Sequence, residues 1–513
     1  MQFPSLNIDV TDDNIGRRTL VVGTVLTSSQ LVHILRVMQS NLQVVGALVP
    51  ASAMDSGRCQ CECSILGNFE QLEHLLGQRE IDHVLVSLPL VMSDQIHQIA
   101  GVLDRLGVHW RFMPTLEDQL AGRTTCRLTG GLPSGARTAA ATMSSCSIDP
   151  AQLIGRMPRP LDERVIGQCV TGKVVMITGA GGSIGSELAR IVSRFRPSIL
   201  ALVERSENAL FEIDREIARV FPDLDRATVL HDISRTQRTH DLIDRLKPDV
   251  IIHAAAHKHV PMMEGHPSEA LENNFYGTRN IADAADQCGV GRFVMVSTDK
   301  AVNPSSVMGA SKRLAELYVQ FLSTRSRTIY SMVRFGNVLG SACSVLPIWS
   351  EQITRGGPVT VTHPDMYRYF MTIPEAAGLV LQAAAMSTGG EVFLLDMGKP
   401  IRILDLARRF LLQHGFEPEV DIAIQFTGVR PGEKLFEELA YDSEQMTPTP
   451  HESIRIWSAS PPDASRMQQV TTTFDRLRNK SGDAAHIWRD VGGQSIINAL
   501  RNAIPEMVSA AAG

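Results

Sequence analysis

The seven residues from Gly179 to Gly185, GlyAlaGlyGlySerIleGly, limit the possible folds of this chain more than any other segment. They lie between an apolar run that is typical of a buried parallel strand, Lys173 to Thr178, and a helical run that contains residues 187–192. Glycines at 179, 182 and 185 let a backbone turn approach a pyrophosphate and aim the N-terminus of the following helix at it. The segment therefore predicts the strand, turn and helix of a dinucleotide-binding unit.

An acidic residue follows the next predicted strand. That strand, Ile199 to Val203, ends in Glu204, 19 residues beyond Gly185. A carboxylate at this distance is placed to bind the hydroxyl groups of an adenosine ribose, which favours NAD as the cofactor. Arg205 could instead contact a 2′-phosphate, so NADP stays open as the alternative.

Two further strand ends complete the predicted nucleotide site. Thr228 to Leu230 leads into Asp232 and Ile233, and Asp249 to His253 leads into Ala254, Ala255 and Ala256. Helical stretches separate these strands, and such alternation gives right-handed crossovers and a parallel sheet with helices on both faces. We expect an α/β fold with a doubly wound parallel sheet and the cofactor across the carboxyl ends of its strands.

Residues 297–304, SerThrAspLysAlaValAsnPro, suggest the chemistry of the site. They follow an apolar run, Arg292 to Val296, so a hydroxyl (Thr298), an acid (Asp299) and a potential base (Lys300) come at the end of a predicted strand. Ligands bind at that edge of an open α/β sheet. Adjacent Asp and Lys residues can also be an ordinary solvated pair, and the segment alone leaves both interpretations open.

Longer motifs follow in order along the chain: the glycine turn, the three alanines, HisLysHisValProMetMetGlu from His257, Asn274 in AsnAsnPheTyrGlyThr, residues 297–304, ArgPheGlyAsnValLeuGlySer from Arg334, and ArgProGlyGluLysLeuPheGluGlu from Arg430. Together they resemble the extended short-chain dehydrogenases/reductases, and among these the polysaccharide-biosynthesis nucleotide-sugar 4,6-dehydratases that act on UDP-N-acetylglucosamine. The resemblance covers roughly residues 150–460. It implies a Rossmann sheet with a smaller substrate-binding lobe.

One position departs from the usual motif of short-chain dehydrogenases. Most of them carry Tyr-x-x-x-Lys, whose tyrosine takes the proton of the alcohol, whereas here Met308 stands in the tyrosine place and Lys312 is retained. Methionine cannot transfer a proton. One branch of the 4,6-dehydratases carries methionine there, so the substitution points to that branch. The resemblance implies that Lys312 holds the nicotinamide ribose. Thr298, Asp299 or a water remain as candidates to accept the proton of the C4 hydroxyl.

The resemblance implies that UDP-N-acetylglucosamine becomes a UDP-4-keto-6-deoxy-hexosamine for surface polysaccharide or glycan synthesis. Lys300 would remove the C5 proton, and Asp299 would protonate the departing C6 hydroxyl. The residues expected to bind the cofactor are Gly179, Gly182, Ser183, Ile184, Gly185, Glu204, Arg205, Asp232, Ile233, Ala254, Ala255, Ala256, Asn274 and Lys312. Those expected to bind the substrate are Lys258, Asn337, Arg368 and Arg430, and for Arg430 a buried pair with Glu433 is the alternative.

Two other functions stay open at this point. A UDP-N-acetylhexosamine 4-epimerase shares the fold and the cofactor but needs no acid–base pair at C5 and C6, so Asp299 and Lys300 argue against it. A catalytically silent NAD-binding regulatory protein is suggested by Met308. The retention of Asp299, Lys300 and Lys312 argues against that function.

Composition narrows the partners and the compartment. The net charge of −6 offers no basic surface for nucleic acid, and no stretch reaches the apolar length that crosses a bilayer. The N-terminus has neither the basic region nor the apolar core of a signal peptide. Eight cysteines fit a reduced cytoplasm, and Cys59, Cys61 and Cys63 lack the spacing of a zinc site, so no metal is expected. We expect a cytoplasmic homo-oligomer, a dimer or larger, that binds a UDP-sugar.

A chain of 513 residues is too long for one domain. Residues 1–17 are expected to be a disordered N-terminus, and residues 18–118 a small degenerate Rossmann-like α/β domain in which Gly23 stands alone before the helix. Residues 119–150, rich in Gly, Ser, Thr and Ala, are a predicted linker. The catalytic domain is expected over 151–465, with the NAD-binding part at about 172–335 and the substrate lobe mostly after 336. Residues 466–513 form a weakly patterned tail.

Overall fold

The computed structural model of the chain describes residues 18–37, 42–54, 63–78, 81–89, 92–113, 115, 153–156, 159–440, 446–457, 460–478 and 492–507. The expected disordered N-terminus, the linker at 119–150, Cys59 and Cys61 lie outside these residues. Where the chain is described, it contains no helix with the length and apolar character needed to cross a membrane. The chain divides into two compact units, and one of them joins the N-terminal part to Trp349–Thr360 and Asp405–Gln425.

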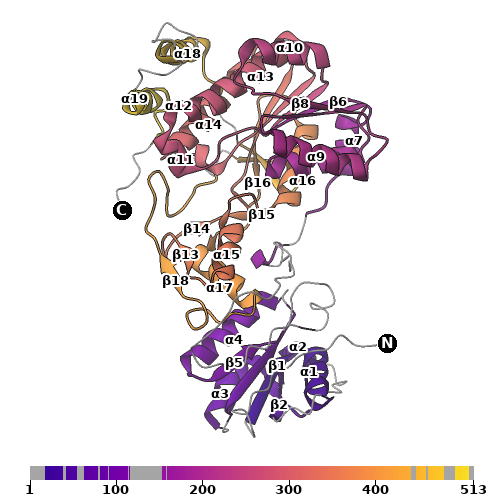
Figure 1. Cartoon of the computed structure of the whole chain (residues 1–513), viewed down its shortest axis with the longest axis vertical. Coiled ribbons are helices and arrows are strands. Elements are labelled where there is room, and N and C mark those ends of the chain that lie inside the picture. The colour runs from indigo at the N-terminus through magenta and orange to yellow at the C-terminus, as the bar shows by residue number, and fades with distance from the viewer. Residues whose placement is uncertain are drawn as a thin grey trace. The chain divides into compact units, whose positions relative to one another are not determined.

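The N-terminal part of the first unit contains a parallel sheet, coloured indigo to purple in Figure 1. Its strands, in the order β3-β2-β1-β4-β5, are β1 (Arg18–Gly23), β2 (Gln43–Val49), β3 (Ile65–Asn68), β4 (His83–Ser87) and β5 (His109–Phe112). The helices are α1 (Val25–Val37), α2 (Ala51–Met54), α3 (Leu72–Gln78) and α4 (Ser93–Arg105), with a 3₁₀ turn at Phe69–Gln71. The expected Rossmann-like α/β fold is confirmed. The sequence did not predict the two short strands β3 and β5, which have four residues each.

The second unit is built on a nine-stranded sheet in the order β19-β20-β16-β11-β10-β9-β6-β7-β8. Its strands are β6 (Val174–Thr178), β7 (Ile199–Glu204), β8 (Arg226–Leu230), β9 (Val250–His253), β10 (Arg292–Val296), β11 (Ile329–Arg334), β16 (Val392–Leu395), β19 (Met446–Pro448) and β20 (Ile454–Trp457). The seven strands from β8 to β16 are parallel, and β20 and β19 pair antiparallel at the edge. The strand order reverses between β6 and β9, which is where open α/β sheets bind their ligands.

Helices cover both faces of this sheet, as Figure 1 shows. One face carries α7 (Glu163–Val170), α8 (Ser183–Arg194), α9 (Glu207–Val220) and α16 (Ile373–Met386); the other carries α10 (Thr236–Leu246), α11 (Val260–Gly265), α12 (Pro267–Ala270), α13 (Gly277–Gln287) and α14 (Val307–Ser323). Alternate residues of a strand point to opposite faces, so Val175 and Ile177 pack in one apolar cluster and Met176 in the other. The predicted doubly wound sheet is confirmed.

Two C-terminal helices, α18 (Ala464–Arg478) and α19 (Gly493–Ala503), belong to the same core as α14. Phe474 and Leu500 are fully buried there. Asp475 accepts hydrogen bonds of 3.0 Å from Tyr276 and from Arg279. The sequence showed little pattern after residue 465, because each of these helices presents only a narrow apolar face.

The remaining elements after residue 336 form small two-stranded sheets and helices. They are β12 (Asn337–Leu339), α15 (Val345–Thr354), β13 (Val359–Val361), β14 (Tyr367–Arg368), β15 (Phe370–Thr372), β17 (Ile401–Arg402), α17 (Ile403–Gln413) and β18 (Ile424–Phe426), and the pairs are β12-β15, β13-β18 and β14-β17. Short strands of this kind suit an expected substrate lobe, but the domain boundaries drawn from the sequence stay predictions.

Candidate cofactor and active site

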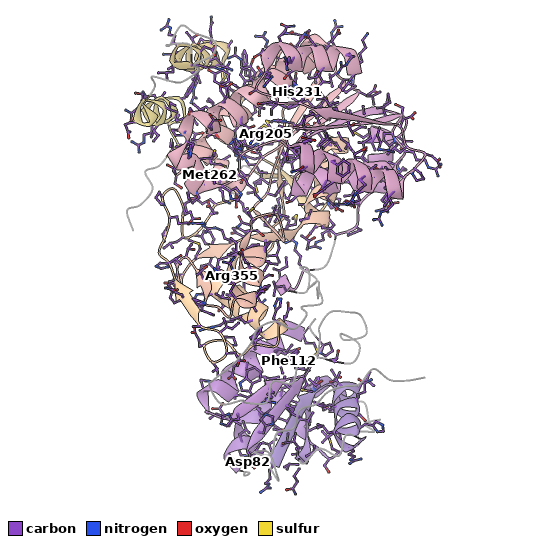
Figure 2. All side chains as sticks on the ribbon, viewed as in Figure 1. Asp82, Phe112, Arg205, His231, Met262 and Arg355 are labelled. Carbon is purple, nitrogen blue, oxygen red and sulfur yellow. The ribbon has the colours of Figure 1, made fainter. Side chains whose placement is uncertain are left out.

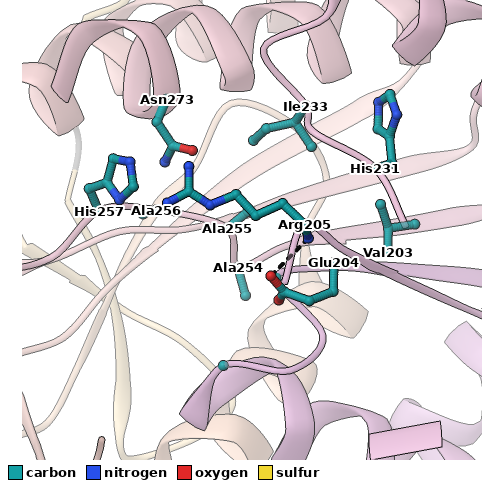
Figure 3. A pocket seen from close by; sticks show the side chains of 12 residues that line it. Val203, Glu204, Arg205, His231, Ile233, Ala254, Ala255, Ala256, His257 and Asn273 are labelled. Atoms are coloured by element: carbon teal, nitrogen blue, oxygen red, sulfur yellow. Dashed lines mark hydrogen bonds between the residues drawn. The ribbon is translucent and has the colours of Figure 1, made fainter. Parts of the chain in front are cut away.

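A cleft opens at the carboxyl ends of β6, β7 and β9, at the point where the strand order reverses. Its volume is about 210 Å³, and it is lined by Gly179, Gly182, Val203, Glu204, Arg205, His231, Ile233, Ala254, Ala255, Ala256, His257 and Asn273. Figure 3 shows Glu204 and Arg205 on one strand end beside Ala254 to Ala256 on another. Residues that are far apart in the sequence are thus brought together as predicted.

The glycines of the turn are required by close backbone contacts. Gly179 has φ +67°, and a Cβ built on it would lie 2.8 Å from the backbone of Ala255. A Cβ on Gly185 would lie only 2.0 Å from the carbonyl oxygen of Gly179. Gly182 begins α8 without a side-chain cap, so the first amides of the helix are available to an anion. This turn fits the pyrophosphate of a dinucleotide.

Glu204, at the end of β7, lies beside the glycine turn. Its carboxylate accepts hydrogen bonds from the backbone amides of Gly181 (3.2 Å), Arg205 (2.8 Å) and Ser206 (3.0 Å). These bonds fix the carboxylate against the cleft wall, where it can accept hydrogen bonds from ribose hydroxyls. The side chain of Arg205 extends across the cleft toward Asn273 and His257 (Figure 3).

A second pocket of about 480 Å³ adjoins this cleft and shares Arg205 and His231 with it; both are labelled in Figure 2. Its lining contains Asp232 and three arginines, Arg205, Arg235 and Arg238. Guanidinium groups suit phosphate oxygens. The sequence pointed to Arg205 and Asp232 but not to Arg235 and Arg238, because these two lie in the helix-start region beyond Asp232, where arginine is common on exposed faces.

Asn274 lies behind the cleft. Its side-chain oxygen accepts from His257 N (2.7 Å), and its amide donates to His257 O and to Ser311 Oγ, both at 3.0 Å. The side chain is fully buried and it is Asn273 that lines the cleft. Asn274 therefore stabilises the loop after β9 through its hydrogen bonds to His257. Its direct contact with a cofactor stays a prediction.

Thr298, Asp299 and Lys300 form one hydrogen-bonded group after β10. Lys300 Nζ donates to Asp299 Oδ1 (2.9 Å) and to Asn337 Oδ1 (3.0 Å), and Thr298 Oγ1 donates to Asp299 Oδ1 (3.0 Å). The Asp299 side chain is fully buried, and that of Lys300 is 18% exposed. A solvated surface pair would be open on both sides, so this geometry favours the functional interpretation.

The loop is aligned by the neighbouring strand β11. Asp299 N donates to Phe335 O (3.0 Å), and Ser297 N donates to Val333 O (2.7 Å). A Cβ on Gly336 would lie 3.1 Å from Asp299 Oδ2, so the second carboxylate oxygen faces this glycine. The ends of β10 and β11 thus place Asp299 and Lys300 beside Asn337, which was expected at the substrate.

Lys312 and Met308 lie one turn apart on α14, and both side chains are almost fully buried. Lys312 Nζ donates to Val296 O (2.7 Å). Burial lowers the pKa of Lys312 to about 8, although the negative charge of Glu316 opposes the shift. His253, beside Lys312, has its pKa lowered to about 3, first by burial and then by the charge of Lys312, so its imidazole is neutral.

Glu316 holds the strand ends to the helix. It accepts hydrogen bonds from Ser297 Oγ (2.7 Å), Arg334 Nε (2.7 Å) and Arg313 Nη1 (3.2 Å). Burial raises its pKa, but the charges and hydrogen bonds of Arg334 and Arg313 outweigh burial and bring it to about 2. Sequence reasoning missed this residue, and the only available signal was an acid four positions after Lys312.

The four expected substrate residues lie in different surroundings. Lys258 Nζ donates to Ala342 O (2.8 Å), Asn337 contacts Lys300, and Arg430 pairs with Glu433 at 2.7 Å with its side chain 56% exposed. The alternative pair of Arg430 with Glu433 is therefore present, but the arginine side chain is exposed. Arg368 is buried and donates to the carbonyl oxygens of Tyr367, Lys434 and Leu435. Substrate contacts of these residues stay predictions.

Known proteins with similar sequences identify the family of this chain. A family described as polysaccharide biosynthesis protein matches residues 175–459, and a CoA-binding domain family matches residues 10–114. The capsular polysaccharide biosynthesis protein CapD of Staphylococcus aureus is 41% identical over 431 residues, 83% of this chain and 69% of that protein. An inverting UDP-N-acetylglucosamine 4,6-dehydratase of Campylobacter jejuni is 30% identical over 52% of this chain and 77% of that enzyme.

A UDP-glucose 4-epimerase of Rickettsia bellii is 32% identical over 53% of this chain and 79% of that enzyme. Among solved structures, the X-ray structure of Pen from Bacillus thuringiensis is 32% identical, covers 57% of this chain and 88% of that one, and superposes with a TM-score of 0.53. The similarity thus includes both dehydratases and epimerases of nucleotide sugars.

Proposed function

This chain belongs to the polysaccharide biosynthesis protein family of nucleotide-sugar-modifying enzymes, within the short-chain dehydrogenases/reductases, and we propose that it is a UDP-N-acetylglucosamine 4,6-dehydratase. The reaction oxidises C4 of the sugar, removes water across C5 and C6, and reduces C6. The product is a UDP-4-keto-6-deoxy-hexosamine, and its use in surface polysaccharide synthesis agrees with the family.

A nicotinamide dinucleotide, when bound, supplies reversible hydride transfer. The cleft fits such a group because a Cβ would fill the turn at Gly179 and Gly185 and because Glu204 closes its ribose end. Lys312 would hold the nicotinamide ribose. Lys300 takes the C5 proton and Asp299 gives a proton to the departing C6 hydroxyl.

The observation that carries the proposal is the 2.9 Å contact between Lys300 Nζ and Asp299 Oδ1. Elimination of water needs a base at C5 and an acid at C6. The pair places both groups at one point, with Lys300 as the base and Asp299 as the acid. Asn337, which also accepts from Lys300, keeps the amine oriented toward the same place.

The UDP-N-acetylhexosamine 4-epimerase stays as the second candidate, since the Rickettsia bellii relative is an epimerase. Epimerisation needs only the C4 chemistry, which Thr298 and Lys312 could support. It leaves the buried Asp299 and Lys300 pair without a task. We therefore favour the dehydratase.

NAD is the proposed cofactor because Glu204 offers a carboxylate to the ribose hydroxyls. The pocket with Arg205, Arg235 and Arg238 supports NADP as the alternative, since its guanidinium groups suit a 2′-phosphate. We also propose that the protein is cytoplasmic and forms a homo-oligomer.

The test is incubation of the purified protein with UDP-N-acetylglucosamine and NAD, with NADP in a parallel reaction. We expect a product that is lighter than the substrate by one water and absorbs at alkaline pH as a 4-keto sugar. An isomer of unchanged mass would establish the epimerase instead. An unaltered substrate would support the silent regulatory protein.

A further inference from the structure

Two side chains of α14 hold the end of β10. Lys312 Nζ donates to Val296 O (2.7 Å), and Glu316, four positions later in the helix, accepts from Ser297 Oγ (2.7 Å). Residues four apart lie on the same face of a helix, so both side chains reach the same strand end. The catalytic group at residues 298–300 follows directly in the chain. Contacts with α14 therefore fix the point from which this group begins.

Glu316 belongs to a cluster of two carboxylates and two guanidinium groups. Arg334 Nε donates to Glu316 Oε1 (2.7 Å), and Arg313 Nη1 donates to Glu316 Oε2 (3.2 Å). Arg313 Nε donates at 3.0 Å to the second carboxylate of the cluster, that of Glu506. The positive and negative charges of these four side chains balance. Glu506 thus supplies the counter-charge that Glu316 alone cannot give to both arginines.

Most of this cluster is shielded from water. The side chains of Arg334 and Arg313 are 1% and 7% exposed, and that of Glu316 is fully buried. Both guanidinium groups also lie over the ring of Trp457 in β20, at 4.6 Å and 5.3 Å from its centroid, where cation–π attraction helps to hold them. Glu506 is the outer member, with a side chain that is 23% exposed.

Glu506 comes from the C-terminal part of the chain, 193 positions after Arg313. It follows α19 and the fully buried Ile504, which packs with Leu500 in the same core as α14. The C-terminal segment is thus joined to the catalytic loop by an unbroken series of contacts. The series runs from Glu506 through Arg313 and Glu316 to Ser297.

We propose that Glu506 is a positioning residue for the catalytic loop. Its carboxylate balances the buried charge of Arg313, so that Glu316 stays in place to accept the hydrogen bond of Ser297. When a buried ion pair loses one partner, the charge that is left is poorly compensated. Without Glu506, Arg313 draws Glu316 toward itself and away from Ser297, and the loop that begins there shifts. Glu506 touches neither sugar nor cofactor, and it acts only through this series of contacts.

The first test is steady-state dehydration of UDP-N-acetylglucosamine, and it rests on the proposed dehydratase reaction. Glu506→Gln keeps the size of the side chain but removes its charge. We expect kcat to fall about five- to fiftyfold with KM within about twofold, because a misplacement of about 1 Å from a distant mutation can cost about a hundredfold.

Asp475→Asn is the matched control. It also weakens an ion pair between the C-terminal segment and the core, but its partner Arg279, at 3.0 Å, lies on α13 rather than on α14. Its kcat should stay within about twofold of wild type, because the catalytic groups keep their positions.

A double-mutant cycle separates positioning from general support. Ser297→Ala removes the last contact of the series, so adding Glu506→Gln to it should lower kcat by less than about a further twofold. Losses from two residues that act independently multiply instead. A role in overall stability alone would therefore give the product of the two single losses.

Hydrogen exchange measured by mass spectrometry tests the same role without substrate. The amides of Ser297 and Asp299 donate to Val333 O and Phe335 O, so a shifted loop exposes them. Exchange in the peptide that contains both should be faster in Glu506→Gln than in wild type, and unchanged in Val174–Thr178 of β6. Ser297→Ala should show the faster exchange by itself, with little added by Glu506→Gln.

Several results would overturn the role of Glu506. They are wild-type kcat and exchange in Glu506→Gln, an equal loss in Asp475→Asn, losses that multiply with those of Ser297→Ala, and faster exchange throughout the protein. If the wild type releases no water, the dehydratase proposal fails, and the exchange measurement still decides the role of Glu506. If Glu506→Gln does not fold, Arg313→Lys replaces it, since an ammonium keeps the charge but lacks the fork that joins both carboxylates. Wild-type kcat and exchange in that variant would also overturn the role.

Discussion

Asp299 uses only one of its two carboxylate oxygens to bind Lys300. Oδ1 accepts the ammonium at 2.9 Å, while Oδ2 is buried with no hydrogen-bond partner in the part of the chain that the structure describes. An unsatisfied buried acceptor costs about 1–3 kcal/mol. A functional site can retain such a cost when a substrate hydroxyl completes the hydrogen bonding, and the departing C6 hydroxyl is a group of this kind.

Removing either member of this pair should stop dehydration in a different way. Lys300→Ala loses the base at C5 but keeps C4 oxidation, so bound NADH should accumulate after mixing with substrate. Asp299→Asn loses the C6 acid but keeps the base, so deuterium from solvent should still enter C5. Each variant should lose about 10²- to 10⁴-fold in turnover. A loss of turnover below tenfold, with unchanged substrate affinity, would mean that Asp299 and Lys300 are an ordinary ion pair without a catalytic role.

Met308 should contribute shape rather than proton transfer. Its side chain is 3% exposed in the main core, so Met308→Ala should cost about 2–5 kcal/mol of unfolding free energy. Met308→Leu, which conserves volume, should cost less than about 1.5 kcal/mol. Folded protein of both variants should keep appreciable dehydratase activity, measured at a temperature where circular dichroism shows intact structure. A fall of several orders of magnitude in the leucine variant would reveal a chemical role.

Cofactor choice should depend on the balance between Glu204 and the arginine pocket. We expect calorimetric titration to give tighter binding of NAD than of NADP by the wild type, and weaker NAD binding by Glu204→Ala. Combined Arg235→Ala and Arg238→Ala substitution should leave NAD affinity nearly unchanged, because these residues line only the second pocket. Tighter binding of NADP by the wild type, lost in the arginine variant, would show that the guanidinium groups decide.

Lys312 should make stability depend on pH in alkaline solution. Its pKa in the folded chain is about 8, below its ordinary value of 10.5, so between these values the unfolded chain binds more protons than the folded one. The free energy of unfolding should therefore rise with pH in this window, by at most about 1.4 kcal/mol per pH unit relative to Lys312→Met. Urea unfolding of both proteins from pH 7 to 10 measures the difference. Identical pH slopes would mean that Lys312 is not titrating there.

Glu316 should be far more important for stability than an ion pair at the surface. Glu316→Gln leaves the buried guanidinium of Arg334 without a full counter-charge, and breaking a buried pair costs about 3–5 kcal/mol. The comparison is Arg355→Ala, labelled in Figure 2, which removes an exposed pair with Glu351 and should change stability by at most about 1 kcal/mol. Similar unfolding midpoints for the two variants would contradict the proposal that Glu316 stabilises the contact between the strand ends and α14.

Local patterns were enough to predict much of the cofactor half. The strand at Arg292–Val296 has the predicted bounds, and the glycine turn lies between β6 and α8 as expected. These features depend on short-range rules: an apolar strand must be buried, and glycine is needed where the backbone of Ala255 approaches Gly179. The hydrogen bonds of Asn274 were not predicted, because only the folded chain brings His257 and Ser311 to its side chain.

The sequence by itself determined the α/β class, the alternation of strands and helices in the cofactor half, the turn that can hold a pyrophosphate, and the residue types of the catalytic loop, because all of these follow from periodicity and spacing within about thirty residues. The tertiary structure alone decided which distant side chains meet. It joined Glu316 to Ser297 and Arg334, and it packed α18 and α19 against α14. Such contacts depend on how helices and loops pack around the sheet. Packing brings together side chains that are far apart in the sequence, according to their shape and burial. A local sequence pattern therefore cannot predict these contacts.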